Sequence, residues 1–164
     1  MDLVIAPDDP GAADVQGLLA RHLAFAQQHS PPDQVYVLDD NGLRDPLVLF
    51  FSVRRNGSLL GVGALKRLDD RHGELKSMHV DESARGQGVG RALVIHLLDV
   101  AAACGMNRVS IETGRIDAFA PAHALYSSVG FTPCEPFAEY ADSDDSVFMS
   151  LALADMGTTR RGRA

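Results

Sequence analysis

The stretch 84-ARGQGVGRALVIHLLDVA-101 places three glycines within five residues, directly before an apolar run with helical periodicity. The apolar residues of the run predict one buried helix face: Val89, Leu93, Val94, Leu97, Leu98 and Ala101. Gly105 is placed to end this helix. The first turn of a helix presents unpaired backbone N–H groups, and glycine lets a large anion approach them closely. The stretch therefore predicts either a phosphate-binding loop or a tight turn that packs the helix onto a sheet.

Strand and helix signals alternate on both sides of this stretch. Asn56-Gly57 between two apolar runs is a strong hairpin signal, and Ser30-Pro31-Pro32 ends a helix. Besides the helix after the glycines and a short element around 39–45, we expect strands over 2–7, Leu47–Arg55, Ser58–Leu68, Gly73–Val80, 107–113 and 146–153, and helices over 9–30 and 120–131. This order predicts a single α/β (α+β) domain over 1–153, with a mixed, mostly antiparallel central sheet and helices on both faces. Residues 154–164 are expected to form a disordered tail.

The composition argues against several classes of protein. A formal net charge of −7 over 164 residues does not suit a general binder of nucleic acid or of an anionic membrane, which needs a basic footprint. The apolar runs are far shorter than a membrane span, and the first ten residues lack the pattern of a signal peptide. Two cysteines and six scattered histidines show no disulfide framework and no metal-ligand spacing. We therefore expect a cytoplasmic protein with no nucleic-acid partner, no membrane partner and no metal.

The glycine spacing excludes two common phosphate-binding motifs. A Walker loop needs Gly-Lys-Ser/Thr, but Gly90 is followed by Arg91-Ala92. The dinucleotide fingerprint needs G-x-G-x-x-G after the first strand of a βαβ unit, whereas this chain has G-x-G-x-G after a meander. An unrelated mononucleotide-binding domain is therefore the weakest of the readings that we consider.

The loop does resemble the coenzyme A signature of the GNAT acyltransferase superfamily, Gln/Arg-x-x-Gly-x-Gly/Ala, which here reads Arg85-Gly86-Gln87-Gly88-Val89-Gly90. The strand "ELKSMHV" precedes it, and "ALYSSVGF" follows it in the way of the family's A-x-x-L-Y-x-x-x-G-F. The segments "HSPPDQVYVLD", "GELKSM" and "CEPFAEY" resemble the YsnE-type group of small bacterial N-acetyltransferases. The resemblance implies the GNAT fold, acetyl-CoA as cofactor, and acetyl transfer to a primary amine of a small molecule without a covalent enzyme intermediate.

The resemblance also implies which residues bind the cofactor. Arg85, Gly86, Gln87, Gly88, Val89 and Gly90 would hold its phosphates, and Met78, His79 and Val80 would pair with pantetheine through their main chain. Many family members carry Asn seven residues before the tyrosine of the second motif, where it contacts pantetheine. Phe119 stands there in this chain, and it could instead form a wall of the acceptor pocket.

Catalytic roles follow from the same resemblance. Glu74 lies eleven residues before Arg85, at the position of the family's general base, and strand alternation places it on one face with Lys76, Met78 and Val80. Glu74 could equally be an ion-pair partner of Lys76 or Arg71. Glu112 and His79 are alternative bases. Tyr126 matches the family's general acid toward the coenzyme A sulfur, although the same position suits a core aromatic residue.

The acceptor depends on which side chains line its pocket. Arg21, His22, His29 and Arg115 would favour an acceptor with a carboxylate, whereas acidic residues would favour a basic acceptor. Tyr36, Asp117, Glu135, Phe137 and Tyr140 also lie in segments that could reach it. A non-catalytic acyl-CoA-binding sensor remains the alternative to an enzyme, and a homodimer through 146–153 is expected from the family.

Overall fold

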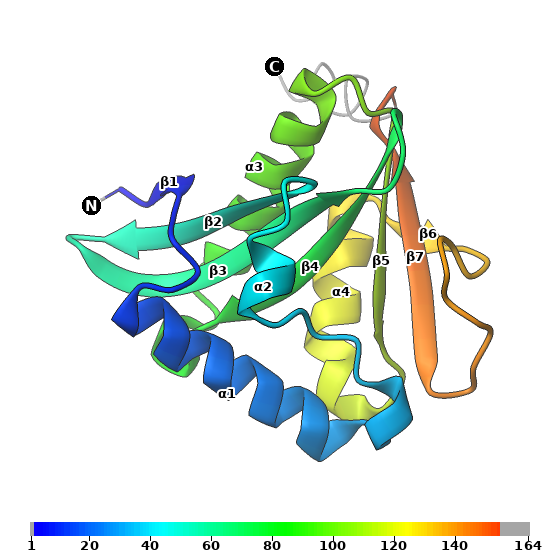
Figure 1. Cartoon of the computed structure of the whole chain (residues 1–164), viewed down its shortest axis with the longest axis horizontal. Helices are drawn as coiled ribbons and strands as arrows, with labels where there is room; N and C mark the ends of the chain where they lie inside the picture. The colour runs from blue at the N-terminus through cyan, green and yellow to red at the C-terminus, as the bar shows by residue number, and fades with distance from the viewer. Residues whose placement is uncertain (1, 155–164) are drawn as a thin grey trace.

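The glycine stretch lies between a central strand of the sheet, His72–Val80, and the helix that the sequence predicts after it, Val89–Ala103. The computed structural model describes residues 2–154 (Figure 1). In chain order the elements are β1 (Val4–Pro7), α1 (Ala13–His29), η1 (Pro32–Gln34), α2 (Asp40–Leu43), β2 (Val48–Arg55), β3 (Ser58–Arg67), β4 (His72–Val80), η2 (Glu82–Ala84), α3 (Val89–Ala103), β5 (Arg108–Gly114), η3 (Asp117–Phe119), α4 (Ala120–Val129), β6 (Thr132–Pro133) and β7 (Ser146–Ala152). Apart from Ala154, the tail predicted to be disordered lies outside the described residues.

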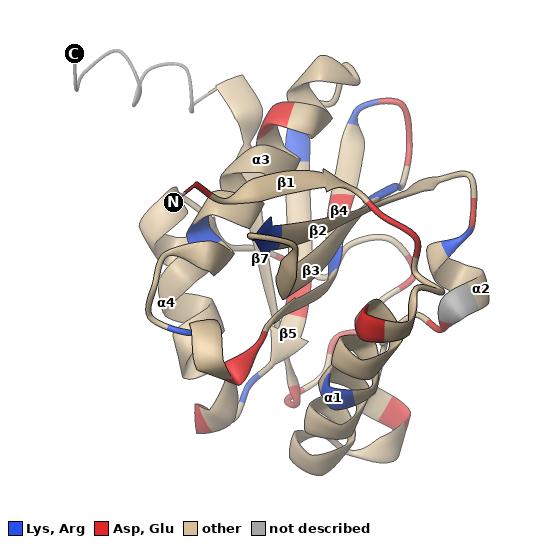
Figure 2. Cartoon of the chain, turned by 90° about the vertical axis from the view of Figure 1, so that its left-hand side faces the viewer, with Lys and Arg blue, Asp and Glu red and all other residues tan. Residues whose placement is uncertain are grey.

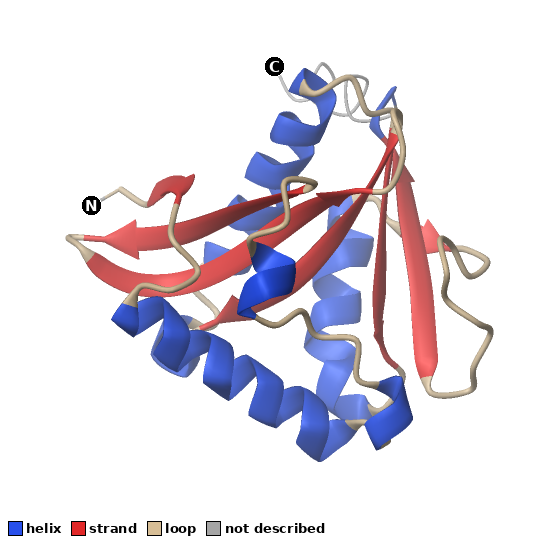
Figure 3. Ribbon diagram, in the orientation of Figure 1, coloured by secondary structure: helices blue, strands red, loops and turns tan. Residues whose placement is uncertain are grey.

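The predicted fold class is confirmed. A seven-stranded sheet has the order β1-β2-β3-β4-β5-β7-β6, and every neighbouring pair is antiparallel except β4 and β5. Figure 3 shows α1 and α2 on one face of the sheet and α3 and α4 on the other. Among the strands of the described residues, only β6 has no counterpart in the sequence prediction, because two residues give no readable alternation.

Each face of the sheet has its own apolar core. The buried stripe of α3, with Leu93 and Leu97 fully buried, packs against β3, β4 and β5 on one side. Val15 and Leu18 of α1 pack against Val62 on the other side. The predicted role of Gly105 is confirmed: it has φ +82°, and the N–H of Met106 donates to the carbonyl of Ala101, as in a Schellman cap.

Strands β4 and β5 part soon after they meet. They pair only where His72–Glu74 faces Arg108–Ser110, and beyond this point the two strands diverge (Figure 1). The β5-facing edge of β4 after Glu74 therefore has no strand partner in the sheet. Parallel pairing that stops after three residues opens the centre of the sheet without unfolding either strand.

A β-bulge in β4 corrects one sequence expectation. Val62 faces His79 and Ala64 faces Lys76, so β4 has one residue more than β3 over this interval, and Ser77 adopts φ +56°. The extra residue reverses the side-chain alternation. Met78 and Val80 consequently pack into the α3 side of the core, away from Glu74 and Lys76, whereas His79 lies on the α1 side and contacts His22.

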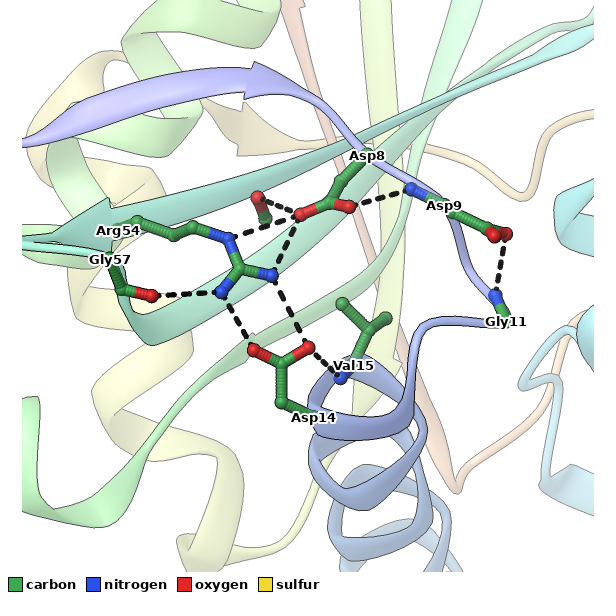
Figure 4. Close-up of polar contacts among 8 residues, drawn as sticks. Asp8, Asp9, Gly11, Asp14, Val15, Arg54 and Gly57 are labelled. Atoms are coloured by element: carbon green, nitrogen blue, oxygen red, sulfur yellow. Dashed lines mark hydrogen bonds and ion pairs between the residues drawn. The ribbon is translucent and has the colours of Figure 1, made fainter.

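An ion-pair network fixes the start of α1 on β2 (Figure 4). The Arg54 guanidinium lies 3.0 Å from an Asp8 carboxylate oxygen and 2.7 Å from one of Asp14, and it also donates to the carbonyl of Gly57. The Ser52 hydroxyl donates to the same Asp8 oxygen at 2.5 Å. Because Asp14 is in the first turn of α1, the network sets where this helix begins to cross the sheet.

The strand expected to form a dimer contact lies inside the sheet. β7 is between β5 and β6, and its outer edge is occupied at Met149 and Ser150 by β6. The N–H of Cys134 also donates to the carbonyl of Phe148. A dimer formed through β7 would therefore have only the ends of this strand available.

Candidate active site

A cavity of about 500 Å3 lies where β4 and β5 diverge. Its walls include α1, the segment 34–37, the glycine loop, η3 and α4. Of the catalytic and cofactor-binding residues predicted from sequence, all but one line it: Glu74, Met78, His79, Val80, Arg85, Gly86, Gly88, Val89, Gly90, Phe119 and Tyr126. The exception is Gln87, whose side chain accepts a hydrogen bond from Arg55 and donates to the carbonyl of Ser83.

The geometry of the glycines suits both of the purposes that the sequence leaves open. Gly86 and Gly88 adopt φ +75° and +80°, and a Cβ on either would meet no atom within 4 Å, so open space lies over the turn. A Cβ on Gly90 would lie 3.2 Å from Leu125 of α4, so this glycine serves close helix packing. The N-terminus of α3 thus faces the cavity with bare backbone, as an anion site requires.

The wall formed by β4 is suited to an extended ligand with amide groups. The edge of β4 beyond Glu74 has no strand partner, so its backbone can pair with an inserted chain. The Ser77 hydroxyl is buried at the bulge and has no hydrogen-bond partner among the described residues. The Arg85 guanidinium donates to the carbonyl of Val80 at 3.3 Å and lies next to the glycine loop. The pantetheine arm and the phosphates of coenzyme A fit a groove with these donors and acceptors.

Glu74 belongs to a buried polar cluster. Only 3% of its surface is exposed. The Tyr140 hydroxyl donates to Glu74 Oε2 at 2.5 Å, and Lys76 Nζ donates to the Tyr140 hydroxyl at 2.8 Å and lies 3.6 Å from the same Oε2. Burial lowers the pKa of Lys76, although Glu74 and Glu112 oppose this effect. Burial raises the pKa of Tyr140, and Glu74 adds to that effect, so the hydroxyl stays protonated.

Glu112 is a second carboxylate on the cavity wall. Its Oε1 accepts a hydrogen bond from the Ser146 hydroxyl at 2.8 Å. Burial raises the pKa of Glu112 above its usual value, and the hydrogen bond from Ser146 and the charge of Lys76 partly offset this. Glu112 is therefore less well compensated by cations than Glu74 is.

His79 and His22 form a contact across the bulge. Their Nδ1 atoms lie 3.3 Å apart, and the rings meet edge to face. Burial lowers the pKa of each imidazole to about 4, helped at His22 by His79 and Lys76 and at His79 by Arg85 and Arg21. Both rings are therefore neutral at pH 7.

Tyr126 and Phe119 complete the wall on the α4 side. Tyr126 is 3% exposed, and burial raises the pKa of its hydroxyl, which keeps its proton for donation. Phe119 packs edge to face against Phe25 of α1, and its ring lies so close to Gly114 that a Cβ there would be 2.3 Å from it. Phe119 thus forms a wall between the end of β5 and α1.

The structure separates the predicted acceptor residues. His22 and Tyr36 line the cavity. Arg21 instead pairs with Asp81 at 3.0 Å, Arg115 donates to the carbonyl of Ser146, and His29 stacks on Phe25. The partnership of Tyr140 with Glu74 was missed, because residues 66 apart in the chain give no spacing signal. The only hint was the "FAEY" segment.

Comparisons with known proteins agree with this geometry. The sequence profile of the acetyltransferase (GNAT) family matches residues 15–131. The chain is 43% identical to the uncharacterised N-acetyltransferase YedL of Escherichia coli, over 92% of this chain and 95% of that protein. It is 41% identical to the uncharacterised N-acetyltransferase YsnE of Bacillus subtilis, over 89% of this chain and 97% of that protein.

A solved structure from Klebsiella pneumoniae, assigned as an acyl-CoA N-acyltransferase, has the same fold. It superposes with a TM-score of 0.76 at 28% sequence identity, covering 92% of this chain and 97% of that chain. The chain therefore belongs to the GNAT family of acetyltransferases, and the predicted YsnE-type resemblance is confirmed. Its cofactor is acetyl-CoA, the acyl donor of this family.

Two further features of the described residues concern membrane spanning and metal binding. No helix within residues 2–154 is long and apolar enough to cross a membrane. Over the same residues no three His, Cys, Asp or Glu side chains are grouped so that they could hold a metal ion. Figure 2 shows Lys and Arg dispersed among Asp and Glu along the described part of the chain.

Proposed function

We propose that the protein transfers the acetyl group of acetyl-CoA to a primary amine of a small molecule by direct attack. The observation that carries the proposal is that one cavity joins the glycine loop, the free edge of β4, Tyr126, the buried Glu74 and the half-buried Glu112. Acetyl-CoA supplies the activated acyl group when it is bound. The amine forms the new C–N bond as the thioester C–S bond breaks.

We assign the general base to Glu74. It lines the cavity, and the Tyr140 hydroxyl and the Lys76 ammonium stabilise its negative charge through Oε2. All of its described side-chain contacts are to that oxygen, which supports Oε1 as the atom that takes the amine proton, directly or through a water. Glu112 is the alternative base, and His79 is disfavoured because its lowered pKa makes it a poor proton acceptor at pH 7.

The remaining roles fall to the bulge of β4, to Tyr126 and to the glycine loop. A backbone N–H at the bulge, at His79 or next to it, would stabilise the developing oxyanion. The Tyr126 hydroxyl would protonate the leaving sulfur. Residues Arg85–Gly90 would hold the phosphates at the N-terminus of α3.

The test measures release of the coenzyme A thiol with a panel of primary amines that includes arylalkylamines, amino acids and polyamines. We expect turnover with at least one amine, and a loss of about 10²-fold or more in kcat for Glu74→Gln. Thermal stabilisation by desulfo-coenzyme A without turnover on any amine would favour the alternative, a non-catalytic acyl-CoA-binding sensor. If Glu112→Gln lost kcat while Glu74→Gln kept it, the base would be reassigned to Glu112.

The localisation and the assembly state of the protein are two further proposals. We propose a cytoplasmic protein, because acetyl-CoA, the acyl donor of the GNAT family, is present in the cytoplasm. A homodimer is proposed from the family resemblance, and sedimentation equilibrium would test it.

A further inference from the structure

The charges in the cavity are segregated along its length. Arg85 and Arg91 lie at the glycine loop and the first turn of α3. Glu74 and Glu112 lie where β4 and β5 diverge. The basic end suits the phosphates of the cofactor, which leaves the acidic end for the acceptor.

The acidic end carries one carboxylate that the protein does not neutralise. Lys76 is committed to Glu74, through the 3.6 Å ion pair and the shared Tyr140 hydroxyl. Glu112 has a neutral hydrogen-bond donor, Ser146, and the other charges that act on it are the more distant Lys76 and Glu74. Two carboxylates and one ammonium leave a net charge of −1 at this end.

The walls around this end are apolar and aromatic. Phe25 and Phe119 meet edge to face with ring centres 5.3 Å apart, and Tyr36 lies on the segment 34–37. Val35, Val37 and Ala26 supply aliphatic surface. Such walls bind the body of a hydrophobic ligand, and aromatic faces also tolerate a nearby cation.

No cation at this end is available for a carboxylate on the acceptor. Among the described residues, the Lys and Arg side chains that line the cavity are Lys76, Arg85 and Arg91. Lys76 is committed to Glu74, and the two arginines lie at the glycine-loop end. An amino acid acceptor would place its carboxylate near Glu112 without compensation, and like charges in a buried site repel strongly.

We propose that the acceptor is a primary amine on an apolar aromatic or alkyl body that carries neither a carboxylate nor a second ammonium group, and that Glu112 binds its ammonium group. This inference rests on the acetyl transfer proposed above. Before the attack, one proton passes from the ammonium to Glu74, which releases it to solvent. As the amide forms and the C–S bond breaks, Tyr126 protonates the sulfur, and the second amine proton restores the Tyr126 hydroxyl through solvent. The products are the N-acetylated amine and coenzyme A with its thiol protonated.

The experiment compares 2-phenylethylamine, L-phenylalanine and spermidine as acceptors, with acetyl-CoA held constant. The first two differ only by a carboxylate, and the third offers amines without an aromatic body. We expect kcat/KM for 2-phenylethylamine to exceed both others by about tenfold or more. Glu112 would repel the carboxylate of L-phenylalanine, and the further ammonium groups of spermidine would lie against apolar walls without a partner. Glu112→Gln should raise KM for 2-phenylethylamine and reduce its advantage over L-phenylalanine, whereas the exposed Glu139→Gln serves as the matched control.

The outcomes separate the two proposals. A preference for L-phenylalanine or spermidine would overturn the acceptor class and leave the acetyltransfer proposal intact. A Glu112→Gln variant that lowers kcat at unchanged KM would overturn the role in ammonium binding. If no amine of the wider panel is acetylated, both proposals fail. The unfolding temperature of each variant with desulfo-coenzyme A shows that the cavity is still formed.

Discussion

Replacing Arg54 by Met should destabilise the protein measurably at neutral pH. Met keeps much of the aliphatic stem and removes the guanidinium that joins Asp8, Asp14 and Gly57. The Asp8 side chain is 20% exposed and the Asp14 side chain 51% exposed. A charged hydrogen bond to a largely buried carboxylate contributes about 1.5–3 kcal/mol, whereas an exposed ion pair contributes up to about 1 kcal/mol. We therefore expect a loss of about 2 kcal/mol in the free energy of unfolding, or roughly 4–8 °C in Tm for a chain of this size.

The pH dependence of this loss identifies its cause. Burial raises the pKa of Asp8, but hydrogen bonds from Ser52, the Asp9 N–H and Arg54 together lower it by more. The pKa of Asp8 therefore lies below its usual value of 3.8. The Arg54 hydrogen bond also lowers the pKa of Asp14. Lowered folded-state pKa values contribute stability that is fully present above about pH 4.5 and is lost as the pH falls through them. The difference between wild type and Arg54→Met should therefore narrow between about pH 4 and pH 2.

Urea unfolding at pH 7, 4.5 and 3 measures this difference directly. Arg44→Met is the matched control, because Arg44 and Asp9 form an ion pair of 2.9 Å with side chains 51% and 61% exposed. That variant should lose no more than about 0.5 kcal/mol. A difference for Arg54→Met that stays constant from pH 7 to pH 3 would refute the electrostatic reasoning and assign the loss to packing.

Three further predictions concern the cavity. Gly88→Ala should cost about 1–2 kcal/mol of stability because Gly88 has φ +80°, and it should reduce stabilisation by desulfo-coenzyme A. Gly105 has φ +82° and lies at the opposite end of α3, so an equal effect of Gly105→Ala on coenzyme A binding would count against the loop assignment. Tyr126→Phe should lower kcat by about tenfold to a hundredfold with KM for acetyl-CoA unchanged, and an unchanged kcat in steady-state assays would remove Tyr126 from the chemistry. The pKa values of His22 and His79 are about 4 in the folded protein. The free energy of unfolding should therefore fall as the pH drops from 6.5 to 4, because the unfolded chain binds protons that the buried rings do not accept. His22→Phe should show a shallower fall in urea titrations, and a fall as steep as that of the wild type would contradict the lowered pKa values.

The elements that carry strong local signals could be predicted from the sequence. The period of the α3 stripe, the Asn56-Gly57 turn and the Gly105 cap act within a few residues, so each one appears in the structure close to its predicted place. The spacing of the glycine loop excludes two other phosphate-binding motifs, and the coenzyme A role that the family resemblance implies for the loop stays a prediction. The individual roles of Glu74 and Tyr126 remain predictions, although both side chains line the cavity.

The long-range features of the site could not be predicted in this way. The contact of Tyr140 with Glu74 joins residues on β4 and on the loop before β7, and nothing in either segment specifies the other. The contact of His22 with His79 could not be predicted from the sequence for a second reason. Regular alternation places His79 on the opposite face of β4 from Glu74, and only the bulge returns it to the α1 side, next to His22.

The bulge in β4 changes which side chains of this strand face the candidate active site. A regular β4 would direct both Ser77 and His79 into the α3 core. One extra residue places Ser77 at φ +56°, leaves its hydroxyl without a described partner, and directs Met78 into the core. A non-glycine residue in the left-handed region costs about 1–2 kcal/mol, so the sheet would be more stable without it. Local strain that opens a strand edge beside a cavity is the kind of departure from regular geometry that a binding site maintains and packing alone does not.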